Sequence, residues 1–152
     1  MKLELIKGEI PKLKFREIEK AVEALAGEID VGGDRIGFIN QTLETIASST
    51  FLKGTGDFWL AYDDDGNLGG YLLGSVSKDI DNKLTYWVSQ AWISKEMRMK
   101  PDVKEWMSRI RQRAKDCLCK HLVFVSSRNP MAFMRWLGTN ARIYSVLIKE
   151  DF

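Results

Sequence analysis

Apolar residues recur every three or four positions in three stretches of the chain, which predicts three amphipathic helices. The first covers residues 12–27, and Gly27 is a suitable stop. The second follows Asp34, which can cap a helix, and the hydroxyl-rich residues 48–50 together with the glycine-containing residues 54–56 are expected to break the chain after it. The third opens at Pro101, because a first helical position needs no N–H. The expected apolar faces are Phe15, Ile18, Val22 and Leu25; Ile36, Ile39, Leu43 and Ile46; and Val103, Trp106, Met107, Ile110, Ala114 and Leu118.

Shorter apolar runs, bounded by turn residues, predict strands in the first two thirds of the chain. An opening strand carries three apolar residues: Leu3, Leu5 and Ile10. Further strands are expected at residues 58–62, 68–77 and 84–93. The turns between these three are too short for a crossover, so the strands should form an antiparallel meander.

The C-terminal part continues with a strand at residues 122–125 and a short helix at residues 131–137. Asn129 can cap this helix and Gly138 can close it. A last strand is expected at residues 143–148. The strand–helix–strand unit implies one parallel pair near the middle of the sheet. Helices around a mixed sheet place the chain in the α/β to α+β fold class.

Length and composition favour one soluble globular domain over residues 1–152. Hydrophobic residues make up 45% and charged residues 29% of the chain. No apolar run approaches the roughly 20 residues of a membrane span, and the N-terminus has no signal-peptide core. We therefore expect a cytoplasmic protein without a membrane partner.

The residue types that bind metals are sparse. His121 is the only histidine, and Cys117 and Cys119 match no zinc spacing, so they are expected to be reduced, half-buried thiols. Asp63 and Asp65 resemble the start of a calcium loop, but the distal glutamate is absent. A hairpin turn is the favoured interpretation there, and no metal site is predicted.

Charge is nearly balanced overall, at +2, but uneven along the chain. Residues 95–120 carry nine Lys and Arg against four Asp and Glu. Such a face could receive a phosphate-bearing ligand or nucleic acid by Coulomb attraction. The simpler interpretation is the solvated face of an amphipathic helix, and nucleic acid is the least favoured partner.

The element order resembles that of the GNAT superfamily of N-acetyltransferases over nearly the whole chain. The sharpest local similarity lies at residues 129–138, where Asn129 starts a helix, Ala132 faces inward and Leu137 precedes the closing Gly138. The resemblance implies a mixed, mostly antiparallel sheet flanked by helices on both faces. It also implies acetyl transfer from acetyl-CoA to a primary amine. Phage-encoded proteins with altered GNAT motifs, including internal virion components, look similar.

In that family a Gln/Arg-x-x-Gly-x-Gly/Ala segment binds the coenzyme diphosphate through successive backbone N–H groups at a helix N-terminus. The matching residues here are 98–103, in which Arg98 fits but Pro101 and Val103 replace the two small residues. Asp102 adds a negative charge beside the expected phosphates. Weak or altered coenzyme binding is therefore expected. The resemblance implies these coenzyme-binding residues: Arg98, Met99, Lys100, Val103, Lys104 and Asn129.

The family's usual acid and base groups are missing. The fourth strand, residues 85–92, has no carboxylate, and Met134 stands where a proton-donating tyrosine is common. Acetyl transfer could then proceed because the enzyme holds an already neutral amine close to the thioester. Tyr144, Tyr86 or Ser89 could substitute, although each also suits a plain strand position. The catalytic candidates are Tyr144 and Ser89.

Trp87 and Trp92 lie five apart on one strand, which predicts opposite faces, with one of them lining the cleft. Core packing is the favoured role for the tryptophans as a group.

Two functions remain open at this point. One is an acetyl-CoA-dependent N-acetyltransferase, whose small-molecule or protein amine enters between the first two helices and the meander. The other is a catalytically inactive GNAT-fold binding or assembly protein, such as a virion-associated component, with a protein partner or a second copy of itself. In the second case exposed Trp or Met residues would mark the interface.

Overall fold

A computed structural model describes residues 2–29, 31–51, 56–98 and 100–125. Its elements follow the order β1 (Lys2–Ile6), α1 (Lys12–Glu28), α2 (Arg35–Phe51), β2 (Gly56–Tyr62), β3 (Leu68–Lys78), β4 (Leu84–Ile93), α3 (Asp102–Asp116) and β5 (His121–Phe124). These elements agree in type and order with those expected from the sequence. The helix expected at residues 131–137 and the strand expected at 143–148 lie outside the described residues.

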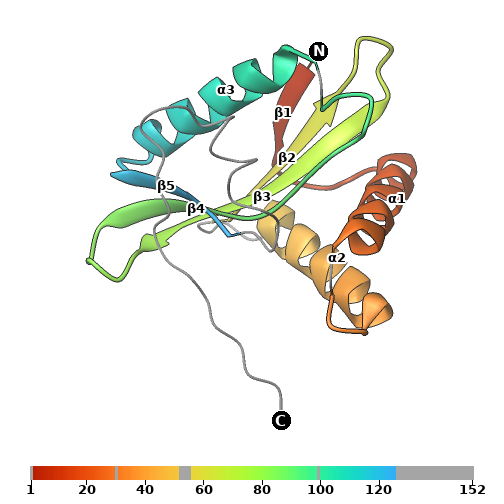
Figure 1. The fold of residues 1–152 in the computed structure, drawn as a ribbon, viewed down its shortest axis with the longest axis horizontal. Helices are drawn as coiled ribbons and strands as arrows, with labels where there is room; N and C mark the ends of the chain where they lie inside the picture. Colours follow the sequence, from red (N-terminus) through yellow and green to blue (C-terminus); the bar gives the residue numbers. More distant parts are fainter. Residues whose placement is uncertain (1, 30, 52–55, 99, 126–152) are drawn as a thin grey trace.

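The described strands form one sheet in the order β1-β2-β3-β4-β5. The pairs β1–β2, β2–β3 and β3–β4 are antiparallel, and β4–β5 is parallel. The predicted meander and the predicted parallel pair are therefore confirmed. Within the described part of the chain the parallel pair lies at one end of the sheet, as Figure 1 shows.

Helices cover both faces of this sheet (Figure 1), which confirms the expected fold class. On one face α1 and α2 bury Ile18, Val22 and Ile46 against the sheet. On the other face α3 buries Trp106, Ile110 and Ala114. Alternation along the strands supplies both cores: in β2, Phe58 and Leu60 face α1 and α2, whereas Trp59 and Ala61 face α3.

The helix α2 runs through residues 48–50 and ends at Phe51, between the two clusters that were expected to break the chain. The side-chain hydroxyls of this stretch donate hydrogen bonds to backbone carbonyls of the preceding turn, so they have partners inside the helix. Ser49 Oγ donates to Thr45 O at 2.8 Å, and Thr50 Oγ1 donates to Ala47 O at 3.0 Å. Ile36 was misassigned to the apolar face, since it is 74% exposed at the first turn of the helix.

The helix α3 ends before Leu118, which was expected on its apolar face. Leu118 instead has φ 61° and is 77% exposed. Its N–H donates to Lys115 O, and the Cys119 N–H donates to Ala114 O. These two bonds form a Schellman motif, in which a left-handed residue satisfies the last carbonyls of the helix. Cys117 and Cys119, on either side of it, are half-buried free thiols, as predicted.

A bulge interrupts β4 between Val88 and Gln90. Gln90 pairs with Leu73 and Val88 pairs with Gly74, so Ser89 is an additional residue in β4. The extra residue shifts the alternation of side chains. Trp92 packs with the α1/α2 core, and Trp87 points to that same face because its neighbours Tyr86 and Val88 face α3. The prediction that Trp87 and Trp92 lie on opposite faces was therefore wrong.

A buried polar cluster fastens the C-terminal half of α3 to the sheet; we call it the Asp57 cluster. Arg113 on α3 donates to both carboxylate oxygens of Asp57, with distances of 2.9 and 3.1 Å. The Tyr86 hydroxyl donates to Asp57 at 2.8 Å and accepts from Trp59 Nε1 at 3.0 Å. Lys7 Nζ lies 3.2 Å from Asp57. Burial on its own raises the pKa of Asp57, but these hydrogen bonds outweigh it and hold the pKa below its ordinary value.

Gly74 makes this cluster possible. A Cβ at Gly74 would lie 2.4 Å from the Tyr86 hydroxyl oxygen and 2.6 Å from its ring. The absence of a side chain therefore lets Tyr86 on β4 lie across β3 and reach Asp57 on β2. At the edge of the sheet, Arg109 on α3 donates to Leu3 O at 2.6 Å.

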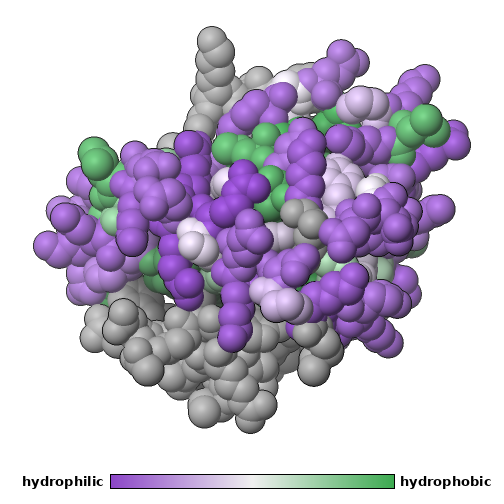
Figure 2. Space-filling model, turned by 90° about the horizontal axis from the view of Figure 1, so that it is seen from above, coloured by the Kyte–Doolittle hydropathy of each residue, from purple (hydrophilic) through white to green (hydrophobic). Residues whose placement is uncertain are grey.

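Figure 2 views the molecule from the side on which α3 lies in Figure 1, and this surface is mainly hydrophilic. Within residues 95–120 the basic side chains that contact acceptors of the protein itself include Arg98, Arg109 and Arg113. None of the described helices is both long and apolar enough to cross a membrane. Four of the five tryptophans lie in described strands and helices, and none of these four is exposed.

Candidate functional site

Pairing between β4 and β5 covers only the first half of β4. Register pairs run from Thr85↔His121 to Val88↔Phe124, and the Val125 N–H then donates to Val88 O at 2.9 Å. Beyond the bulge, residues 90–93 continue to pair with β3. In the part of the chain that the structure describes, no strand pairs with them on the β5 side. Among the described residues, this second half of β4 therefore has a backbone edge that no strand covers, with Ile93 O alone held by a side chain, that of Arg98.

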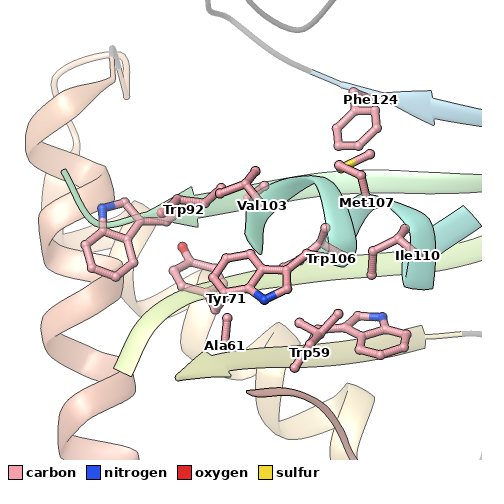
Figure 3. Close-up of a pocket in the computed structure, with 13 residues that line it drawn as sticks. Trp59, Ala61, Tyr71, Trp92, Val103, Trp106, Met107, Ile110 and Phe124 are labelled. Carbon is pink, nitrogen blue, oxygen red and sulfur yellow. The ribbon is translucent and has the colours of Figure 1, made fainter. Parts of the chain in front are cut away.

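An apolar cavity of about 50 Å³ lies between α3 and the sheet beside this edge (Figure 3). Ala91 and Ile93 of β4, Val103 and Trp106 of α3, and Phe124 of β5 border it. The rest of its lining comes from β1–β3 and from the middle of α3: Leu3, Trp59, Ala61, Tyr71, Leu72, Trp92, Met107 and Ile110. Its size would suit a few carbon atoms or waters. The sequence placed these apolar residues in the core but gave no sign of the space between them.

The surface of the cavity is apolar throughout, although one of its lining residues carries a buried polar atom. Trp106 is 8% exposed, and its indole Nε1 is buried with no hydrogen-bond partner. Figure 3 shows the Trp106 ring between α3 and the strands β2 and β3. A buried N–H without an acceptor is costly, and an acceptor on a ligand would relieve that cost.

The loop between β4 and α3 was predicted to cradle a diphosphate, and its described amides are largely used within the chain. The N–H groups of Met97 and Arg98 both donate to Ser94 O. The N–H of Lys100 donates to Met97 O at 3.1 Å. After Pro101, which has no N–H, the amides of Val103 and Lys104 donate to Lys100 O and Pro101 O. The loop is therefore a series of tight turns and not an open row of donors.

Arg98, the predicted diphosphate ligand, is engaged by the protein itself. Its Nε donates to Ile93 O at 2.9 Å, and its Nη2 forms an ion pair with Glu28 at the end of α1. Both side chains are about three-quarters buried. Arg98 thus ties the β4–α3 loop to α1. Its predicted role toward the coenzyme stays a prediction.

The other predicted coenzyme residues fall in different places. Lys100 and Lys104 are exposed, and Val103 is buried and points into the cavity. The bulk of Val103 is therefore directed away from the surface where phosphates would lie. Met99 and Asn129 lie outside the described residues.

Of the hydroxyl residues considered for catalysis, the structure describes Ser89 and Tyr86. Ser89 is exposed at the bulge, and its hydroxyl oxygen lies 3.4 Å from Leu73 O. Tyr86, the third hydroxyl considered, belongs to the Asp57 cluster, where burial raises its pKa above the ordinary value. Tyr144 lies outside the described residues. Among the described residues no group of three His, Cys, Asp or Glu side chains could hold a metal.

A second polar group next to the bulge was missed by sequence reasoning. Gln90 accepts a hydrogen bond from the Tyr71 hydroxyl at 3.1 Å and donates to Thr42 Oγ1 on α2 at 2.9 Å. Tyr71 stacks on Trp92, with ring centroids 6.5 Å apart, and burial raises the pKa of its hydroxyl. The Gln90 amide is therefore fixed on the α1/α2 side of β4. Only the spatial contact between α2 and β4 reveals this role, because Thr42 is 48 residues away in sequence.

The residues present fit one part of acetyl-CoA better than the other. A short acyl group matches the apolar cavity, and an extended chain with amide groups can pair with a free strand edge. The diphosphate lacks a matching cradle, because the described loop amides and Arg98 already have partners. The geometry supports binding of an acyl thioester arm and gives no support for diphosphate binding at α3.

No family model matches the sequence, and no curated protein matches it. Solved structures do match its fold. A putative acetyl transferase from Pyrococcus furiosus superposes with a TM-score of 0.72 at 16% identity, over 99% of this chain and 100% of that one. An aminoglycoside antibiotic 6'-N-acetyltransferase from Acinetobacter haemolyticus gives 0.67 at 12% identity, over 100% and 99%. Glucosamine-6-phosphate N-acetyltransferase from Arabidopsis thaliana gives 0.60 at 13%, over 100% and 99%.

These similarities define a class of fold. The chain has the GNAT fold found in these acetyltransferases, as its element order had suggested. At 10–16% identity the agreement concerns the fold alone.

Proposed function

We propose that the protein transfers an acetyl group from acetyl-CoA to a primary amine. The observation that carries the proposal is the edge of β4 that no described strand covers, which begins at the bulge of Ser89 and borders an apolar cavity. The similarity of the whole fold to acetyltransferases supports it.

In this reaction the amine nitrogen forms a bond to the thioester carbonyl carbon, the carbon–sulfur bond breaks, and the amine proton leaves. The coenzyme supplies the activated acyl group. The chain supplies position: the backbone of residues 90–92 can bind an extended arm, and the cavity beside Ala91 can exclude water from the acyl group. The fixed Gln90 amide faces the α1/α2 side, from which an amine can approach.

None of the residues on β4 can act as a strong base. The strand carries hydroxyl and amide groups, Ser89 and Gln90 among them, but no carboxylate. The amine must therefore arrive neutral, and proximity supplies most of the acceleration. We expect the rate to rise about tenfold per pH unit until the pKa of the amine is reached, about 10 for a lysine side chain.

The test measures donor binding and acetyl transfer on the full chain. Calorimetry with acetyl-CoA should give a saturable isotherm, and mass spectrometry should show an acetylated amine from a panel of primary amines. Saturation at 100 times the dissociation constant should stabilise the fold by about 2.7 kcal/mol. Absence of both binding and product at millimolar acetyl-CoA would refute the proposal.

A matched pair of variants locates the binding region. Ala91→Phe places a ring in the space between β4 and α3 and should weaken acetyl-CoA binding at least about tenfold. Ala24→Phe makes the same change at a half-buried position on α1, across the sheet, and should change binding less than about threefold. Equal losses in the two variants would place the donor elsewhere.

A further inference from the structure

We propose that the protein recognises its acyl donor through the pantetheine arm and the acyl group, and that the nucleotide end of CoA contributes little. Acyl-pantetheine thioesters that lack the nucleotide would then serve as donors as well as acetyl-CoA does. This inference rests on the proposed acyl transfer and names the class of donor.

The first argument is the shortage of free backbone donors at the start of α3. A diphosphate site of the helix N-terminal type needs several N–H groups that point outward together. Here the amides of Arg98, Lys100, Val103 and Lys104 all have acceptors within the chain. Pro101, at the point where the helix opens, has no N–H to give.

The second argument is the charge around the same position. The first turn of α3 carries Asp102 and Glu105, two carboxylates that already complement the positive end of the helix dipole. Arg98 is held by Glu28 and by Ile93 O. Lys100 and Lys104 are exposed, so their attraction for a phosphate is weakened by water and salt.

The third argument is that the contacts suited to the arm are present. Among the described residues the second half of β4 has no strand paired on its β5 side and only Ile93 O is held, by Arg98; amides of an extended ligand can pair with the remaining edge. The cavity behind it is apolar, as an acyl group requires.

The experiment compares two donors on the full chain by calorimetry: acetyl-CoA and S-acetyl-pantetheine. We expect dissociation constants within about threefold of each other. Raising the salt from low to high concentration should change both equally, because phosphate contacts are the salt-sensitive ones. Adenosine 3',5'-bisphosphate at millimolar concentration should displace neither.

The possible results distinguish a failure of this inference from a failure of the proposed acetyl transfer. Binding of acetyl-CoA with a loss of more than about thirtyfold for S-acetyl-pantetheine would overturn this inference and leave the acetyltransferase proposal standing. Failure of both donors to bind would overturn both proposals.

Two variants of one ion pair test Arg98 separately. Arg98→Ala removes the guanidinium, and Glu28→Gln breaks the same ion pair but leaves the guanidinium in place. We expect each to change the ratio of the two dissociation constants less than about threefold. A selective loss of acetyl-CoA binding in Arg98→Ala, absent in Glu28→Gln, would show that Arg98 holds the diphosphate and would contradict the inference.

Discussion

The two ends of α3 meet the sheet in different ways. At the C-terminal half Arg113 reaches the buried Asp57, and Tyr86 completes the contact from β4. At the N-terminal half Val103 and Trp106 cover an apolar cavity. Directional, charged hydrogen bonds fix the position of the helix at one end, and incomplete packing leaves space at the other. The space at the N-terminal end is therefore separate from the hydrogen bonds that hold the C-terminal end.

Removing the Asp57 carboxylate should have the largest effect on the stability of the protein. Asp57→Ala leaves the Tyr86 hydroxyl and the Arg113 guanidinium without their acceptor, and breaking a buried pair costs about 3–5 kcal/mol. Urea unfolding should show that loss in the free energy of unfolding. Asp65→Ala, in the exposed hairpin turn, is the control and should change it by less than about 0.5 kcal/mol. Equal effects would mean that the Asp57 cluster is not what fastens α3.

Lowering the pH should weaken the contact between the C-terminal half of α3 and the sheet. The folded-state pKa of Asp57 lies below its unfolded value, so its contribution to stability is complete above about pH 4 and is lost as pH falls through the folded pKa. The pKa of Asp79 is also lowered, mainly by the hydrogen bond from the Lys83 N–H and further by the Thr85 hydroxyl. Its contribution to stability is therefore lost in acid in the same way. Free energies of unfolding at a series of acidic pH values should fall less steeply in Asp57→Asn than in the original chain. An unchanged slope would contradict this assignment.

Adding one methyl group at Gly74 should also disturb the fastened end. Gly74→Ala places a Cβ against the buried Tyr86 ring and should cost about 1–3 kcal/mol. Gly69→Ala is the matched control: its Cβ would meet the side chain of Met97 at 2.9 Å, and a methionine can move aside. The loss should be smaller in that variant. In the background of Tyr86→Phe, the cost of Gly74→Ala should shrink, because the two changes act on one contact.

Adding a single methylene group at one position near each end of α3 tests the packing of the two ends directly. Val88→Ile adds it at a position that is 1% exposed and lies outside the cavity lining, and it should cost about 1–2 kcal/mol. Val103→Ile adds it toward the cavity and should leave stability unchanged or raise it by up to about 1 kcal/mol. Thermal unfolding of the pair would check this. A larger loss in Val103→Ile would mean that the space is not usable.

The smallest expected effect lies at the end of α3. Leu118→Gly relieves a side chain held at φ 61°, where a Cβ is disfavoured, and Leu118 buries little that would be lost. We expect a gain of about 0.5–1 kcal/mol in the free energy of unfolding. Leu118→Ala keeps a Cβ and should bring no such gain, which separates backbone relief from loss of an exposed leucine.

Local patterns predicted most of the fold. The order of elements, the meander and the extent of β4 depend on neighbours in sequence, and all three agree with the structure. The exact ends of two helices depend on local hydrogen bonds and backbone angles that single residues do not show. Ser49 and Thr50 satisfy their hydroxyls inside α2, and a leucine takes the left-handed position that glycine usually fills after α3.

The site was harder to predict, because its features depend on distant pairs. The bulge at Ser89 is a relation between β3 and β4, and it reverses the face of every later side chain in β4, Trp92 included. The pairing of Arg98 with Glu28 spans 70 residues, and that of Arg113 with Asp57 spans 56. The sequence did show that Pro101 and Val103 depart from a diphosphate loop, and the bonded amides agree with that departure.

The hydrogen bond from Arg109 to Leu3 O affects how readily separate molecules can associate through β1. A strand at the border of a sheet invites a strand of another molecule to add to it, which is a common route to aggregation. In β1 one such carbonyl is already occupied by a guanidinium, the strand has five residues, and Lys2 and Glu4 place charges along it. Concentrated solutions of this protein should therefore resist joining through β1.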